Sequence, residues 1–130
     1  MISTVTFDFW ETLVKDSPEN LNAQRTLRVE ALRLALSRAG AGLAVEEVEE
    51  AYDRSLTVLQ ERFWSRHRDP TYREQVRLVL DCAVPGVADR LADDILEATV
   101  TDYISPVLSL PPALQSGAAE AVRRLAARGL

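Results

Sequence analysis

Hydrophobic residues recur every three or four positions along most of this chain, which is the spacing of an amphipathic helix. The clearest stripe combines this spacing with four glutamates in the first turns, where the helix dipole favours negative charge; its apolar members are Val45, Val48, Tyr52, Leu56, Leu59 and Phe63. Such a stripe is typical of core packing. Glycines and prolines interrupt this spacing and mark where helices end. Together they predict helices over residues 21–39, 45–66, 71–83, 87–104 and 113–128.

The spacing also predicts which side of each helix faces inward. For residues 21–39 the expected inner face is Leu27, Ala31, Leu34 and Ala35, with Leu32, Leu36 and Ala39 on its flank. The other inward positions are Tyr72, Val76, Val79 and Leu80 in the third helix, Leu91, Ile95 and Ala98 in the fourth, and Leu114, Ala118, Ala121, Val122 and Leu125 in the last.

The first residues follow a different pattern. Residues 4–14, TVTFDFWETLV, are rich in β-branched and aromatic side chains and predict a strand that stops on an acid and then turns. Open α/β sheets place their chemistry at the carboxyl ends of strands, so Asp8 is a candidate nucleophile. Taken alone, an aspartate after a strand is more often a turn former or a helix cap.

The run Asp8-Phe9-Trp10-Glu11-Thr12-Leu13 resembles the first motif of the haloacid dehalogenase-like (HAD) superfamily, whose usual form is Asp-x-Asp-Gly-Thr-Leu/Val. The resemblance implies an α/β fold, with a Rossmann-like core and Asp8 as the nucleophile of a covalent aspartyl intermediate. It further implies that Thr12 orients Asp8. A metal ion, if used, would be held by Asp8 and the backbone carbonyl of Trp10.

Two positions depart from this motif. Trp10 stands where the phosphatase branch has a second aspartate, and an indole cannot perform that residue's general acid–base work. A halide leaving group needs no proton, so Trp10 favours carbon–halogen cleavage. Against this, most members of the superfamily act on phosphate esters. A phosphatase would need Mg²⁺ and a dehalogenase no cofactor. Glu11 stands where glycine is usual, and is strained if the position needs a positive φ; it is also a candidate substitute acid.

Composition narrows the function further. The 130 residues are 47% hydrophobic and 27% charged, which is typical of a folded, soluble protein. The net charge of −5 argues against a nucleic-acid partner, and the sequence offers neither a membrane span nor a targeting segment, so we expect a cytoplasmic protein acting on a small molecule. The single Cys82 and the single His67 exclude an internal disulfide, a serine–histidine triad and a cysteine-based zinc site. Cys82 is expected to be a small buried hydrophobe and His67 to lie at a helix end.

The expected organisation is a first core strand and nucleophile loop (1–15), an inserted helical cap (16–106), and a return to the core (107–130), with the proline-rich run from Ser105 to Pro112 at the boundary.

The pair Asp93-Asp94 is expected on a solvated face in the middle of a helix, and not as a metal site. The family's later lysine and acidic pair have no counterpart, because Lys15 is too close to Asp8 in sequence.

We therefore expect these residues to be the N-terminal portion of a longer enzyme, with an incomplete core, little activity alone, and an exposed strand edge that favours self-association. The competing interpretation is a non-catalytic helical interaction module, in which Asp8 only caps a turn. That interpretation requires an exposed apolar patch in the grooves between helices, with Phe63 and Trp64 as the residues to inspect.

Overall fold

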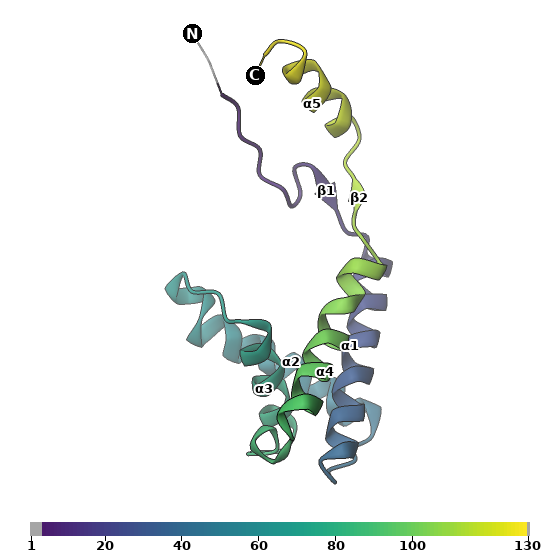
Figure 1. The fold of residues 1–130 in the computed structure, drawn as a ribbon, viewed down its shortest axis with the longest axis vertical. Coiled ribbons are helices and arrows are strands. Elements are labelled where there is room, and N and C mark those ends of the chain that lie inside the picture. Colours follow the sequence, from purple (N-terminus) through teal and green to yellow (C-terminus); the bar gives the residue numbers. More distant parts are fainter. Residues whose placement is uncertain (1–3, 130) are drawn as a thin grey trace.

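A computed structural model describes residues 4–129 (Figure 1). The described chain is mostly helical, as the sequence predicts. Residues 1–3 and Leu130, which belong to the expected outer segments, lie outside the described residues. The elements in chain order are β1 (Val14–Lys15), α1 (Pro18–Arg38), α2 (Val45–Arg62), the 3₁₀ turn η1 (Trp64–Arg66), α3 (Tyr72–Ala83), the 3₁₀ turn η2 (Ala88–Arg90), α4 (Asp93–Ser109), β2 (Ala113–Leu114) and α5 (Ala118–Ala126).

Figure 1 shows two parts joined end to end. Helices α1 to α4 form a helical bundle, residues 18–109. The strands, α5 and the N-terminal segment form a smaller part, residues 4–15 and 113–129, which we call the β-module. The chain crosses between the two parts twice, through residues 16–17 and 110–112, which we call the linkers. The bundle is therefore an insertion whose two ends return to the same place.

The core of the bundle lies where α1 meets α2, α3 and α4. On α1 the buried side chains are Val29, Ala31, Leu32, Ala35 and Leu36, joined by Gln24. The prediction of the inner face of this helix was wrong: the buried face is rotated about the helix axis by part of a turn from the predicted one. Leu27 is 47% exposed, whereas Leu36 is fully buried. The neighbouring helices pack on the side of α1 that carries Leu32 and Leu36, and that packing, not spacing, selects the buried face.

Helices α2 and α3 follow their predicted faces more closely. Val48, Tyr52 and Leu59 of α2 are buried, and so are Val76, Val79 and Leu80 of α3. Val45, Leu56 and Tyr72, which the spacing predicts to be inward, are exposed. Between Tyr52 and Leu59 the inward place belongs to Ser55, whose hydroxyl donates to the carbonyl oxygen of Tyr52 at 2.6 Å and so remains satisfied in the core.

Helix α4 differs from its prediction at both ends. It begins at Asp93, after the short turn η2, so Asp93 and Asp94 are exposed in its first turn and not in mid-helix. Packing against α1 and α3 decides which side of α4 faces inward: the buried side chains are Leu96, Thr99, Tyr103 and Pro106, whereas Ala98 is exposed. The helix also passes through Pro106 and ends at Ser109, so the proline-rich run begins inside the bundle.

The predicted strand over residues 4–14 is not formed. Residues 4–8 have no regular secondary structure and are exposed, and only Val14–Lys15 is a strand. It pairs antiparallel with β2, Val14 opposite Leu114 and Lys15 opposite Ala113, so the described sheet is not the parallel sheet of a Rossmann-like core. A strand is stable only when a neighbour accepts its backbone hydrogen bonds, and the described backbone hydrogen bonds join none of residues 4–8 to another segment. The expected last helix is shorter than predicted, because residues 113–114 form β2.

Candidate functional site

Asp8 lies at the end of the extended N-terminal segment, where it is exposed to solvent. Its Oδ1 atom accepts a hydrogen bond of 2.8 Å from the backbone N–H of Phe9, the next residue. The carboxylate is thus neither buried in a helix nor engaged by a cation in the described part of the chain. Its accessible position is compatible with a nucleophile, and equally with a residue that caps a turn.

A tight turn follows Asp8. The carbonyl oxygen of Phe9 accepts from the N–H groups of Leu13 at 3.0 Å and Val14 at 3.1 Å, and the N–H of Glu11 donates to the carbonyl of Val14 at 2.8 Å. Glu11 has φ of 59°, in the left-handed region. This is the conformation that the glycine of the motif would adopt freely, and a residue with a side chain pays roughly 1 kcal/mol or more for it. The strain predicted for Glu11 is therefore present.

Gln115 ties this turn to the far end of the bundle insertion. Its backbone N–H donates to the carbonyl of Leu13 at 2.9 Å, and its side-chain Nε2 donates to the carbonyl of Glu11 at 3.3 Å. The sequence gives no signal for this role, because Gln115 is separated from the turn by the whole bundle. The consequence is that the shape of the Asp8 turn depends on β2 being in place.

Thr12 is exposed, and none of the described hydrogen bonds joins its hydroxyl to Asp8. Its orienting role stays a prediction. The metal assignment has similarly little support: Asp8 and the backbone carbonyl of Trp10 offer two oxygen donors, whereas Mg²⁺ prefers six in an octahedral arrangement. Residues 4–129 contain no cluster of three or more His, Cys, Asp or Glu side chains able to hold a metal.

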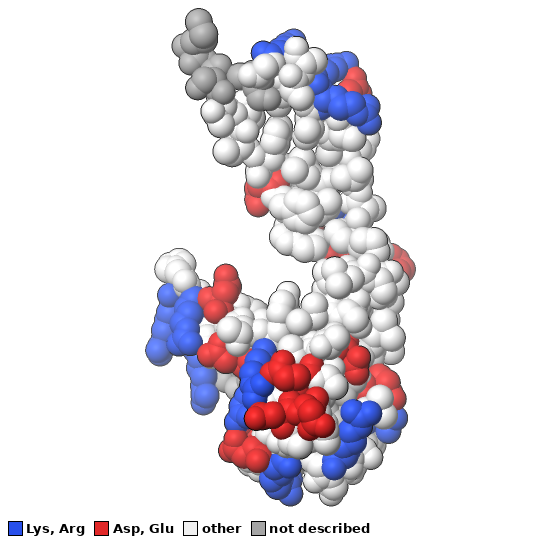
Figure 2. All heavy atoms as spheres, viewed as in Figure 1, with Lys and Arg blue, Asp and Glu red and all other residues white. Residues whose placement is uncertain are grey.

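An apolar surface lies next to Asp8. Phe9 and Trp10 are about half exposed and meet edge to face with ring centroids 5.5 Å apart. Beside them Leu114 is 67% exposed. A groove of about 350 Å³ runs between the turn and α5, lined by Phe9, Leu13, Val14, Leu114, Ala118, Ala119, Val122 and Arg123. In Figure 2 the middle of the β-module is largely uncharged on the face shown.

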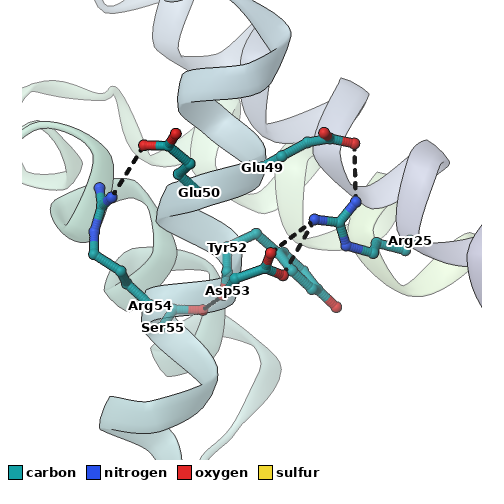
Figure 3. Close-up of polar contacts among 7 residues, drawn as sticks. All are labelled: Arg25, Glu49, Glu50, Tyr52, Asp53, Arg54 and Ser55. Atoms are coloured by element: carbon teal, nitrogen blue, oxygen red, sulfur yellow. Dashed lines mark hydrogen bonds and ion pairs between the residues drawn. The ribbon is translucent and has the colours of Figure 1, made fainter.

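About half of the charged residues of the bundle form ion pairs with one another. Figure 3 shows Arg25 of α1 between two acids of α2, with Nη1 2.8 Å from Glu49 Oε1 and Nη2 3.1 Å from both oxygens of Asp53. Its guanidinium also lies 5.8 Å from the centroid of the Tyr52 ring. Sequence reasoning missed this network because its members are far apart in sequence. Every partner is satisfied within the network, so it supports the packing of α1 on α2 and does not form an open site.

Tyr103 extends this network onto α4. The guanidinium of Arg28 lies 5.2 Å from the centroid of its ring, and Arg28 Nε donates to its backbone carbonyl at 3.2 Å. Burial raises the pKa of the Tyr103 hydroxyl far above its ordinary value, and the neighbouring Tyr52 raises it further. Tyr103 therefore stays neutral at any physiological pH and acts as a packing residue.

Lysine, histidine and cysteine each occur once in the sequence, as Lys15, His67 and Cys82. Lys15 is exposed in β1. His67 ends η1 with φ of 53°, so it lies at a helix end as predicted. Cys82 is partly buried and not fully buried as expected; burial raises the pKa of its thiol, which disfavours the reactive thiolate. Asp93 pairs with Arg73 at 2.7 Å on the surface.

Comparison of the chain with protein-family models, with curated proteins and with solved structures gives no match. Among residues 4–129, no helix combines the length and the apolar character needed to cross a membrane.

Proposed function

We propose that this chain carries the nucleophile turn and the helical cap of a HAD-like hydrolase, with Asp8 as the nucleophile. The observation that supports the proposal most is topological. The motif-like turn directly precedes an inserted helical bundle, and the two ends of that insertion are paired with each other as β1 and β2. Glu11 adds to it, because its positive φ falls at the position where the motif carries glycine.

The proposed chemistry has two steps. A carboxylate oxygen of Asp8 forms a bond to the phosphorus of a phosphate ester, or to the carbon that bears the halogen of a 2-haloacid, as the bond to the leaving group breaks. Water then hydrolyses the aspartyl intermediate and returns the carboxylate. An alkoxide leaving group takes up a proton, which Trp10 cannot supply, whereas a halide leaves without one. Trp10 therefore favours the haloacid, and both substrate classes stay within the proposal.

The 130 residues by themselves are expected to turn over substrate negligibly. The Asp8 carboxylate is open to water, and its described partner is the N–H of the adjacent residue. Preorganised donors and cations that stabilise the developing charge supply several kilocalories per mole of catalysis in enzymes, and a single exposed lysine, Lys15, does not replace them. Catalysis by this family's route needs groups that the Asp8 turn does not hold.

The test is hydrolysis that depends on Asp8. The 130-residue chain and a polypeptide that also includes whatever its reading frame encodes after Leu130 are assayed with p-nitrophenyl phosphate and with a 2-haloacid, each with and without Mg²⁺. The Asp8→Asn variant of both polypeptides is the matched control, because it keeps the size of the side chain and removes the nucleophile. We expect negligible turnover by the 130 residues, and Asp8-dependent turnover by the longer polypeptide where the reading frame continues.

Each outcome has a defined meaning. Turnover that needs Mg²⁺ identifies a phosphatase, and halide release without metal identifies a dehalogenase. Turnover by the 130 residues that Asp8→Asn abolishes would show that the turn is a sufficient site and would correct the expectation above. A longer polypeptide with no hydrolase activity, or with activity unchanged in Asp8→Asn, would remove the proposal.

A second candidate is a non-catalytic interaction module, and the exposed apolar groove favours it. The larger groove lies on the β-module. A smaller one of about 200 Å³ lies between α1 and α4, where that interpretation expected it, and its apolar lining includes the exposed Leu27 and Leu34. At the residues named for inspection, Trp64 is 38% exposed, and Phe63 is partly buried with the Arg68 guanidinium 5.1 Å from its ring centroid. Sedimentation of the chain and of Leu114→Glu tests this candidate. Association that the variant abolishes, together with no Asp8-dependent hydrolysis, supports this candidate, and a wild-type chain that stays monomeric at high concentration counts against it.

A further inference from the structure

Gln24 differs from the other buried polar side chains of the bundle. The described residues bury Gln24, Ser55 and Thr99. The hydroxyls of Ser55 and Thr99 donate to carbonyls of their own helices, those of Tyr52 and Ile95. Gln24 Nε2 instead donates to the carbonyl of Leu110, 86 residues away, at 3.1 Å. A buried amide that bonds across elements fixes their relative position, whereas one that bonds within its helix does not.

The carbonyl of Leu110 receives a second donor from the same helix. Asn20 lies one turn before Gln24 on α1, and its Nδ2 also donates to Leu110 at 3.1 Å. Leu110 is the residue that caps the C-terminus of α4 and begins the second linker. Asn20 Nδ2 bonds in addition to Asp16 Oδ1 in the first linker, at 2.5 Å. One turn of α1 therefore holds both linkers.

We propose that Asn20 and Gln24 form an amide clamp that holds the helical bundle and the β-module in one fixed orientation. Without the clamp, the two parts are connected by the two short linkers, whose β-module ends are joined to each other by the two-residue pairing of β1 with β2. So short a pairing contributes little stiffness, because an isolated two-stranded ribbon is marginal in water. The carbonyl of Leu110 would also lose its side-chain donors, and a helix-terminal carbonyl left without a partner turns toward water.

The clamp determines how the β-module faces the bundle. In Figure 2 a hollow separates the β-module from the arm of the bundle, which Figure 1 shows to be the end of α2 together with η1. The width of this hollow depends on the orientation of the two parts. The proposal does not depend on the hydrolase assignment, since it concerns contacts between the two parts alone.

The experiment measures the orientation by double electron–electron resonance between two spin labels. In a Cys82→Ala background, labels are placed through Arg66→Cys on the arm and Ala121→Cys on α5, both of which are exposed positions. A second pair, Arg66→Cys with Arg38→Cys, lies within the bundle and reports whether the bundle stays folded.

The clamp is removed with Asn20→Leu and Gln24→Leu together, which keep apolar bulk and delete both amides. Thr99→Val is the matched control, because it removes a buried polar group whose hydrogen bond stays within α4. Asn20→Ala alone is a milder variant that breaks the bonds from Asn20 to both linkers and tests the proposal if the double variant does not fold.

We expect a narrow bundle-to-α5 distance distribution in the wild type and in Thr99→Val, and a broadened or shifted one in the clamp variants, with the distribution inside the bundle unchanged throughout. A wild-type distribution that is already broad would overturn the proposal. So would clamp variants with an unchanged distribution, or a Thr99→Val variant that broadens as much as they do.

Discussion

Two leucines on the same helix test which face of α1 is buried. Leu36 is fully buried in the bundle core, whereas Leu27 is 47% exposed, although the hydrophobic spacing places Leu27 on the inner face. Truncating a buried leucine to alanine costs the transfer free energy of the lost carbons and leaves a cavity, about 3 kcal/mol in total. Truncating a half-exposed leucine leaves no cavity and costs about 1 kcal/mol or less.

The comparison cancels the intrinsic helix preference, because Leu36→Ala and Leu27→Ala make the same replacement within one helix. Unfolding is followed by far-ultraviolet circular dichroism in urea and by heating. For a domain of this size, about 3 kcal/mol corresponds to a melting temperature lowered by about 12 to 24 °C. We expect this for Leu36→Ala and only a few degrees for Leu27→Ala.

The result that refutes the reasoning is equally direct. Equal destabilisation by the two variants, or a larger effect of Leu27→Ala, would mean that α1 is rotated about its axis relative to the described bundle. The denaturant slope serves as a check, because a change in slope would show that a variant alters the unfolded state or populates an intermediate.

Three further predictions concern the turns and helix ends. Ala44 precedes α2, and its N–H already donates to Glu47 Oε2 at 2.8 Å, so Ala44→Ser completes a capping box and should raise the free energy of unfolding in urea by about 1 kcal/mol. Glu11→Gly relieves the positive φ and should stabilise the chain by up to about 1 kcal/mol, whereas Glu11→Ala should not, and melting temperatures of both variants distinguish strain from loss of charge. Hydrogen bonds from the backbone and side chain of Thr71 hold the pKa of Glu74 below its ordinary value of 4.5, so its contribution is complete above that pH and is lost as the pH falls through the lowered value. The stability difference between wild type and Glu74→Gln, measured by urea titration, should therefore shrink on acidification, and a difference that grows would contradict the assignment.

The sequence alone determined where the helices lie, because helix formation is local. Hydrophobic spacing and the glycines and prolines between segments place α1, α2 and α3 within a few residues of their described bounds. The motif pattern also pointed to the turn after Asp8, and the strain expected at Glu11 is there. These features depend on residues close together in the chain, which a single sequence contains.

Only the tertiary structure decided which faces are buried and whether the strand forms. Spacing could not choose between the Leu27 and Leu36 sides of α1, since both carry leucines and the packing partners make the choice. Residues 4–8 have the composition of a strand, yet a strand needs a neighbour far away in the sequence to accept its hydrogen bonds. The amides of Asn20 and Gln24 reach the carbonyl of Leu110 because α1 and α4 pack side by side. No pattern in the sequence predicts this contact.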